Sequence, residues 1–170
     1  MVMAGGVPVY VPLRPSTAHG GGAGGGGARF ARDEFTVHAN DLRLAMSART
    51  KLVILNNPHN PTGKMFSRAE LLEIAAVVRE HPRALVLSDE VYEHVVYGGE
   101  LAHERIASLP GMWERTLTVS SIGKTFSCTG WKIGAGPPPR ALLAVHGACC
   151  RLVCGPLAPR VPGDERESVD

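Results

Sequence analysis

The sequence has no marked excess of either charge and no long apolar run, and these absences argue against two classes of function. Its 18 basic residues and 16 acidic residues give a formal net charge of +2, which is too small to predict binding to nucleic acid or to an acidic membrane surface. No apolar run reaches the roughly 18 residues that cross a bilayer. The N-terminal stretch MVMAGGVPVYVPL lacks a charged segment, so we predict no signal peptide. We expect a cytoplasmic location, with a mitochondrial one left open.

Cysteine is also scarce, with four residues in the chain: Cys128, Cys149, Cys150 and Cys154. Two of them are adjacent and poorly placed to bridge each other. His146 lies near the last two, but no second His/Cys pair at zinc-finger spacing accompanies them. We therefore predict reduced thiols and no metal site.

Glycine, in contrast, is abundant and concentrated in one run. The stretch HGGGAGGGGARF at 19–30 has high backbone entropy and almost nothing to bury, which predicts a flexible loop. HGGG also resembles the oxyanion-hole motif of some esterases. That interpretation requires a G-x-S-x-G nucleophile turn, which the sequence does not contain.

Apolar periodicity predicts two helices in the first half of the chain. The first covers 40–48 and is expected to be capped by Asn40. The second covers 67–81, where Ser67 and Glu70 are spaced as a capping box. Its apolar stripe comprises Leu71, Ile74, Ala75 and Val78.

Four segments have the composition of strands. A short, proline-interrupted strand is expected at 7–13, and buried strands are expected at 51–55, 84–88 and 116–121, the first of these buried on both faces. Strands that alternate with a helix predict an α/β fold with a mostly parallel sheet and flanking helices. After Gly136 the composition changes: we expect one helix within 137–150 and a disordered tail at 151–170.

Polar residues follow each of the three buried strands. Asn60 follows the first, Asp89 ends the second, and Lys124 lies just beyond the third. The carboxyl ends of parallel strands meet at one edge of a sheet, and ligands bind there. We therefore expect these three side chains, with Tyr92 close behind Asp89, to face one pocket.

This set of side chains suits pyridoxal 5′-phosphate. A carboxylate pairs with the protonated ring nitrogen, and a lysine forms a Schiff base with the aldehyde. Two unit charges about 4 Å apart attract by about 4 kcal/mol at an effective dielectric of about 20. Such a pair keeps the ring protonated.

Other interpretations remain at this point. The letters IGKT match the end of a phosphate-binding P-loop, but its first glycine would fall at Thr118. Taken singly, Asp89 suits a strand-end cap, Asn60 suits a turn, and Lys132 suits a solvated charge. Four further residues are interpreted as structural or peripheral: Glu90, His94, Tyr97 and Trp131.

Three ordered motifs carry a family resemblance. They are NNPHNPTG at 56–63, SDEVYEHVVY at 88–97 and SSIGKTFSCTGWKIG at 120–134. Together they resemble the class I, fold-type-I aminotransferases, and most of all the kynurenine aminotransferase / cysteine-S-conjugate β-lyase group. The resemblance covers roughly residues 1–136, and implies that this segment is the central part of the family's large domain, incomplete at both ends.

The resemblance implies a role for each motif residue. Lys124 would form the Schiff base and then carry the transferred proton, while Asp89 would pair with the pyridinium nitrogen. Asn60 and Tyr92 would bond the ring oxygen. Two further residues, Ser121 and Lys132, would hold the phosphate.

The resemblance also implies a homodimer that carries out transamination between an amino acid and a 2-oxo acid. The amino acid substrates it implies are kynurenine, glutamine, aromatic amino acids or cysteine conjugates, with a β-lyase side activity on the last. The glycine-rich phosphate loop and the substrate-clamping arginine of the family have no counterpart in these 170 residues. The second hypothesis is therefore a non-catalytic fragment that at most binds the cofactor or a complete relative.

Overall fold

The computed structural model describes residues 2–15, 35–97, 102–131 and 134–135. The glycine-rich loop predicted at 19–30, the helix predicted within 137–150 and the tail predicted at 151–170 lie outside the described residues. So do Lys132 and three of the four cysteines, and the predictions made for them stay predictions.

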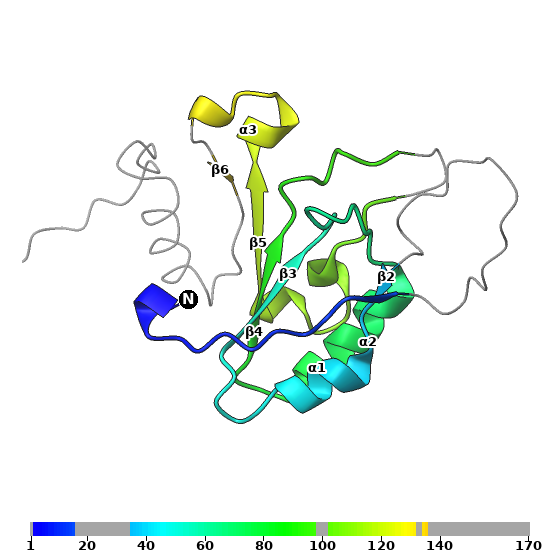
Figure 1. The fold of residues 1–170 in the computed structure, drawn as a ribbon, viewed down its shortest axis with the longest axis vertical. Coiled ribbons are helices and arrows are strands. Elements are labelled where there is room, and N and C mark those ends of the chain that lie inside the picture. The colour runs from blue at the N-terminus through cyan, green and yellow to red at the C-terminus, as the bar shows by residue number, and fades with distance from the viewer. Residues whose placement is uncertain (1, 16–34, 98–101, 132–133, 136–170) are drawn as a thin grey trace, which may run out of the picture.

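A four-stranded sheet forms the centre of the fold (Figure 1). Its order is β3 (Leu52–Asn56), β4 (Leu85–Asp89), β5 (Thr116–Ser121) and β6 (Gly134–Ala135). The first three strands are parallel to one another, and β6 pairs antiparallel with the end of β5. The predicted α/β class with a mostly parallel sheet is confirmed.

Two α-helices and several short elements accompany this sheet. The helices are α1 (Ala39–Ala45) and α2 (Arg68–Arg79), which lie side by side (Figure 1). A one-turn helix, α3 (Ile122–Thr125), follows β5 directly. The two-residue strands β1 (Arg14–Pro15) and β2 (Phe35–Thr36) form a separate antiparallel pair. The 3₁₀ turns are η1 (Val2–Ala4), η3 (Ile106–Ser108), η4 (Trp113–Arg115) and η5 (Thr129–Trp131).

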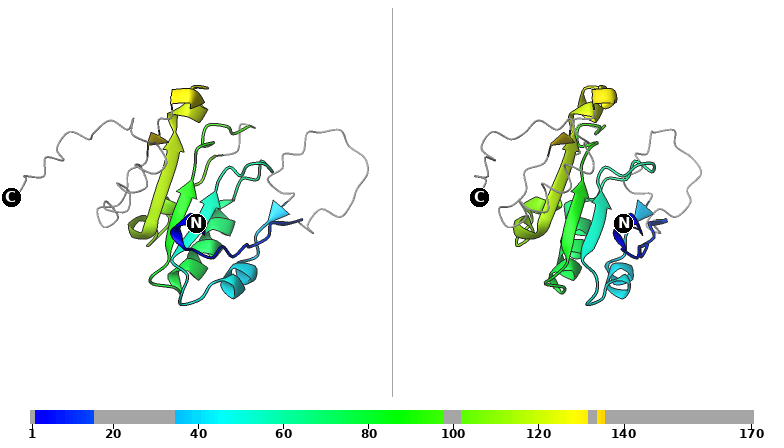
Figure 2. Two further views of the ribbon diagram at one scale, coloured as in Figure 1. Left: turned by 60° about the vertical axis from the view of Figure 1, so that its left-hand side comes forward. Right: turned by 90° about the vertical axis from the view of Figure 1, so that its left-hand side faces the viewer.

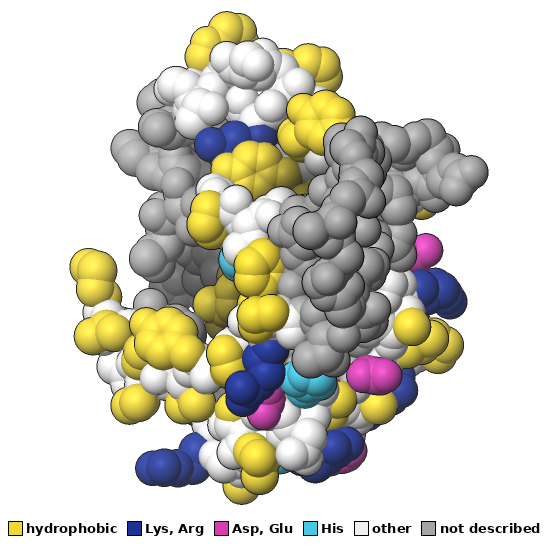
Figure 3. Space-filling view, turned by 45° about the vertical axis from the view of Figure 1, so that its right-hand side comes forward, with side chains coloured by type: hydrophobic (Ala, Val, Ile, Leu, Met, Phe, Trp, Pro, Cys, Tyr) yellow, Lys and Arg dark blue, Asp and Glu magenta, His cyan; other side chains and the backbone are white. Residues whose placement is uncertain are grey.

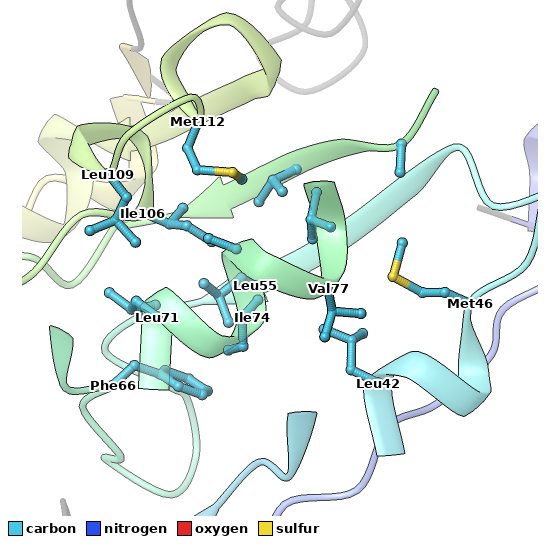
Figure 4. Packing of buried hydrophobic residues seen from close by; sticks show 14 residues of the cluster. Leu42, Met46, Leu55, Phe66, Leu71, Ile74, Val77, Ile106, Leu109 and Met112 are labelled. Atoms are coloured by element: carbon cyan, nitrogen blue, oxygen red, sulfur yellow. The ribbon is translucent and has the colours of Figure 1, made fainter. Parts of the chain in front are cut away.

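The core is formed by α2 packed against the sheet and against α1 (Figure 4). The predicted stripe of α2 is fully buried, with Leu71, Ala75 and Val78 at 0% exposure and Ile74 at 3%. Figure 4 shows Leu42 of α1 next to Val77 of α2 and Met112 with Ile106 and Leu109 at the other end of the core. This packing determines which side chains of the strands face the interior.

The capping box predicted for α2 is present. The Ser67 hydroxyl accepts the Glu70 backbone N–H at 3.2 Å, and the Glu70 carboxylate accepts the Ser67 backbone N–H at 2.8 Å. The two bonds satisfy orphan donors of the first helical turn. The start of α2 is therefore defined by its own sequence.

Three local predictions are wrong. Residues 7–13 do not form a strand, because Pro8 and Pro12 lack the N–H groups that a ladder needs. Helix α1 begins at Ala39 with His38 at the N-cap, so Asn40 is inside the helix and is not its cap.

Burial on both faces of β3 is the third wrong prediction. Leu55 packs on the core, whereas Ile54, which alternates with it, is 47% exposed. Helix α2 covers only one face of the sheet among the described residues (Figure 2). The continuous apolar run of β3 does not indicate whether other elements cover the second face of the sheet.

Hydrophobic side chains are also exposed outside the sheet (Figure 3). In the N-terminal segment Val7 and Tyr10 are each 86% exposed, whereas Val11 and Leu13 pack against the core. Within the described residues, no helix combines the length and the apolarity needed to cross a bilayer.

The capping box yields a prediction on stability. We expect Ser67→Ala to lower the free energy of unfolding by about 1 kcal/mol, because the first turn of α2 loses its side-chain acceptor. Ser67→Thr keeps the hydroxyl and is the matched control, expected to stay close to the unsubstituted chain. Urea denaturation followed by circular dichroism measures both. Equal losses in the two variants would contradict a capping role.

Candidate active site

The carboxyl ends of three parallel strands lie along one edge of the sheet. In the strand register Asn56 of β3 pairs with Asp89 of β4, and Asp89 pairs with Val119 of β5. Strand β5 runs on to Ser121 and leads into α3, which carries Lys124 beyond the tip of the sheet (Figure 1). Motifs far apart in sequence therefore meet at this edge.

Tyr92 connects two of the predicted site residues. The Asn60 side-chain amide donates a hydrogen bond to the Tyr92 hydroxyl at 3.2 Å. The Lys124 ammonium lies 5.6 Å from the centre of the Tyr92 ring, within cation–π range. Asn60, Tyr92 and Lys124 come from three different motifs, and they form one continuous group.

Asp89 lies beside this group at the end of β4, and its side chain is half-buried. One carboxylate oxygen accepts the Val91 backbone N–H at 3.3 Å. Burial raises the pKa of the Asp89 carboxyl, and the nearby charge of Glu90 adds to this, while the bond from Val91 opposes it. No basic side chain in the described ranges forms an ion pair with Asp89. This carboxylate suits a cationic partner brought by a ligand.

The turn that presents Lys124 depends on Gly123. Gly123 is buried, and a Cβ at this position would lie 3.0 Å from the Thr129 Cα and 3.2 Å from the Ser121 hydroxyl. The Gly123 carbonyl also accepts the Cys128 backbone N–H at 2.9 Å. A side chain at 123 would push these segments apart, so glycine keeps α3 against the following turn. Lys124 itself is exposed, and Ser121 is half-buried at the start of the same turn.

The loop between β3 and α2, which carries Asn60, is held at its base by Asn57. This side chain is 2% exposed, donates to the Glu104 carbonyl at 2.9 Å and accepts the Phe66 N–H at 3.1 Å. The loop contains two cis peptide bonds, Asn57–Pro58 and Asn60–Pro61. Asn57 therefore satisfies buried polar groups at the base of the loop.

A buried ion pair holds the other end of this loop. The Lys64 side chain is 1% exposed, its ammonium lies 2.8 Å from the Glu70 carboxylate, and it sits over the Phe66 ring at 5.0 Å from the centroid. Burial alone would raise the pKa of Glu70, but hydrogen bonds from Lys64 and Ser67 outweigh it and lower the pKa. Sequence reasoning missed Lys64, because nothing in GKMF distinguishes a buried lysine from an exposed one.

Glu90 was predicted to be structural, and it is the centre of a buried network. It is 1% exposed and accepts hydrogen bonds from Ser88 at 2.8 Å, His103 at 2.9 Å and Arg105 at 3.1 Å. Arg105 also bonds Glu93. This network fixes the backbone that follows Asp89.

Glu93 extends the network to the next strand. Its carboxylate accepts the Ser120 hydroxyl at 2.6 Å. Burial would raise the pKa of Glu93, but the bonds from Ser120 and Arg105 outweigh it and lower the pKa. Ligand atoms of Glu90, Glu93 and His103 lie within 4.8 Å of one another. Arg105 bonds both carboxylates, so the acidic groups of this cluster are paired, whereas the buried Nδ1 of His103 has no hydrogen-bond partner in the described part of the chain.

The model of the family described as "Aminotransferase class I and II" matches residues 2–143. The chain belongs to this aminotransferase family. The resemblance predicted from the three motifs is thereby confirmed.

Curated aminotransferases of known name match most of the chain. It is 49% identical over 135 residues to the kynurenine–oxoglutarate transaminase of Dictyostelium discoideum, covering 79% of this chain and 30% of that protein. It is 46% identical over 141 residues to kynurenine–oxoglutarate transaminase 3 of Rattus norvegicus, covering 83% and 29%. The chain therefore spans about 30% of the length of the curated relatives it matches.

Solved aminotransferase structures share the fold. N-succinyldiaminopimelate aminotransferase from Mycobacterium tuberculosis aligns with a TM-score of 0.74 at 40% identity, covering 90% of this chain and 36% of that one. An aromatic aminotransferase from Pyrococcus horikoshii OT3 aligns with a TM-score of 0.62 at 39% identity, covering 72% and 34%.

The raised pKa of Asp89 generates a prediction on stability. A carboxyl whose pKa is raised by folding destabilises the fold wherever it is ionised, and this penalty vanishes below its unfolded pKa of about 3.9. We therefore expect Asp89→Asn to stabilise this aminotransferase chain at pH 7. The gain should shrink as the pH falls towards 4, because the carboxyl of the unsubstituted chain becomes neutral.

Urea denaturation at several pH values between 4 and 8 measures the effect. Asp41→Asn is the control, because the Arg14 guanidinium, 2.6 Å away, lowers the pKa of that exposed carboxyl. The control is expected to give no gain at neutral pH. A loss of stability in Asp89→Asn at pH 7 would contradict the prediction.

Proposed function

We propose that this chain carries the cofactor-binding edge of a pyridoxal 5′-phosphate-dependent aminotransferase, which transfers an amino group between an amino acid and a 2-oxo acid. The observation that supports this most strongly is the convergence of Asn60, Tyr92 and Lys124 at the strand ends next to Asp89. Membership of the aminotransferase family supports the same reaction class.

The donor set fits this cofactor. When bound, pyridoxal phosphate supplies an aldehyde that condenses with an amine and a ring that accepts electrons. Lys124 is the exposed amine at the site, and Asp89 is a half-buried carboxylate without an ionic partner in the described part of the chain. Asn60 and Tyr92 add an amide and a hydroxyl, which are hydrogen-bonded to each other.

Each residue then has a role that its chemistry permits. Lys124 Nζ would hold the cofactor covalently through its aldehyde carbon and, when free of that link, would carry the proton that transamination moves from the amino acid to the cofactor. Asp89 would accept the N–H of the ring and keep that nitrogen protonated. Tyr92 and Asn60 would donate to the ring oxygen. Ser121, at the start of α3, and Lys132, which lies outside the described residues, would bind the phosphate.

The substrates and the assembly are part of the proposal. The names of the curated relatives favour kynurenine and oxoglutarate as a donor and acceptor pair. Glutamine, aromatic amino acids and cysteine conjugates, the last with β-lyase chemistry, are the other donors that the motif resemblance suggests. We propose that the active form is a homodimer.

The second candidate function is a chain that binds the cofactor, or a complete relative, without turnover. The 170 residues contain no counterpart of the glycine-rich phosphate loop or the substrate-clamping arginine that the family resemblance implies, and this favours the second candidate for these residues taken alone. Where the second candidate binds the cofactor, it shares Lys124 as the attachment site with the first and differs from it only in catalysis. Two measurements on the same protein therefore distinguish the two candidate functions.

The first measurement tests cofactor attachment. After incubation with pyridoxal phosphate and reduction with borohydride, we expect a stable adduct on Lys124, mapped by peptide mass spectrometry. The sequence contains only four lysines, Lys51, Lys64, Lys124 and Lys132, so the assignment is direct. Lys124→Arg keeps the charge but removes the nucleophile and should lose the adduct. Labelling that is confined to another lysine would refute the site.

The second measurement tests turnover. We expect the 170-residue chain alone to show little transamination of kynurenine with oxoglutarate, because this chain contains neither the glycine-rich phosphate loop nor the substrate-clamping arginine that the family resemblance implies. Product formation followed by chromatography checks this, with Lys124→Arg as the blank. Robust turnover above that blank would favour the enzyme over the binding-only chain.

A further inference from the structure

Asn56, which the motif analysis did not single out as a site residue, joins two parts of the candidate site. It is the last residue of β3, and both ends of its side-chain amide are used. Its oxygen accepts the Asn60 backbone N–H at 2.7 Å, and its nitrogen donates to the Asp89 carbonyl at 3.1 Å. The Asn57 backbone N–H donates to the same Asp89 carbonyl at 3.0 Å.

The hydrogen bond from Asn60 to the Asn56 side chain holds the exposed part of the loop between β3 and α2. Asn57 and Lys64 hold the two ends of this loop through buried contacts, whereas Asn60 itself is exposed and has little packing to place it. Within the described ranges, Asn60 forms one hydrogen bond to Asn56 and one to Tyr92. Asn56 therefore sets the position from which the Asn60 amide reaches the Tyr92 hydroxyl.

The bond to Asp89 acts on the neighbouring strand. Asn56 and Asp89 are partners in the parallel register, so their side chains emerge on the same face of the sheet. Donation to the Asp89 carbonyl fixes the backbone that carries the carboxylate. One side chain thus places both the amide and the acid of the site.

Only a side chain with a donor and an acceptor can make both bonds. A neutral amide offers both, an ionised carboxylate only accepts, and leucine offers neither at nearly the same size. Asn56→Asp and Asn56→Leu therefore remove one bond and two bonds, respectively.

We propose that Asn56 is a positioning residue for the cofactor site, because its side chain fixes Asn60 and Asp89 relative to each other. The inference rests on the proposed function. It concerns a residue that contacts the site residues and not the reacting atoms.

The test compares four forms of the 170-residue chain: unsubstituted, Asn56→Leu, Asn56→Asp and Ile74→Val. The last is a control for general loss of stability, because Ile74 is buried in the core on α2 at 3% exposure. Two properties are measured. Amide hydrogen exchange at Asn60, followed by NMR, reports the bond to Asn56 directly. The pyridoxal phosphate concentration that half-saturates borohydride-trapped labelling of Lys124 reports the site.

For Asn56→Leu we expect hydrogen exchange at the Asn60 amide to accelerate by roughly three- to tenfold, which corresponds to the free energy of one ordinary hydrogen bond. We also expect the half-saturating concentration of pyridoxal phosphate to rise several-fold. Asn56→Asp keeps the acceptor, so the Asn60 amide should stay protected while the half-saturating concentration still rises. Ile74→Val, whose loss of stability is verified separately by a urea titration, should leave the half-saturating concentration unchanged.

The outcomes separate this inference from the proposed function. If Asn56→Leu matches Ile74→Val in both measurements while Lys124 is labelled, the inference alone is overturned. If the unsubstituted chain gives no adduct on Lys124, the proposed function fails and the cofactor role of Asn56 fails with it. The exchange measurement then still decides whether Asn56 holds the loop.

Discussion

The candidate site depends on the parallel pairing of β3 with β4, which sets Asn56 beside Asp89. A register shift of one residue would turn every side chain of β3 to the opposite face, and both amide bonds of Asn56 would be lost. The packing of α2 on one face of the sheet specifies this register, since Leu55 and Val86 must both reach the core. Hydrophobic packing in the interior thus determines which polar groups meet at the sheet edge.

Much of this arrangement could be predicted from the sequence, because the relevant signals are local. The Ser67–Glu70 spacing defines the start of α2, and the apolar runs that end at Asp89 and Ser121 define two strand ends. One topological rule, that parallel strands share a carboxyl edge, then brings distant motifs together. The family followed from the same three motifs, since their order and spacing are specific in combination.

What could not be predicted depends on tertiary contacts. Asn40 has a good capping side chain, yet the helix starts at Ala39 and leaves it inside. The apolar run of β3 gave no sign that Ile54 would be exposed. The partners of Glu90 lie up to 15 residues away, in a segment without a recognisable pattern. The double role of Asn56 is invisible in NNPHNPTG, because adjacent asparagines in a proline-rich turn look alike until their partners are known.

The burial of Lys64 has a consequence for chemical modification of the protein. An amine at 1% exposure, held by a carboxylate and an aromatic ring, is sterically shielded from acylating reagents as long as the chain is folded around it. Exposed amines such as that of Lys51 lack this shielding. The extent of Lys64 acylation relative to Lys51 would therefore serve as an internal gauge of how often the segment between β3 and α2 opens to solvent.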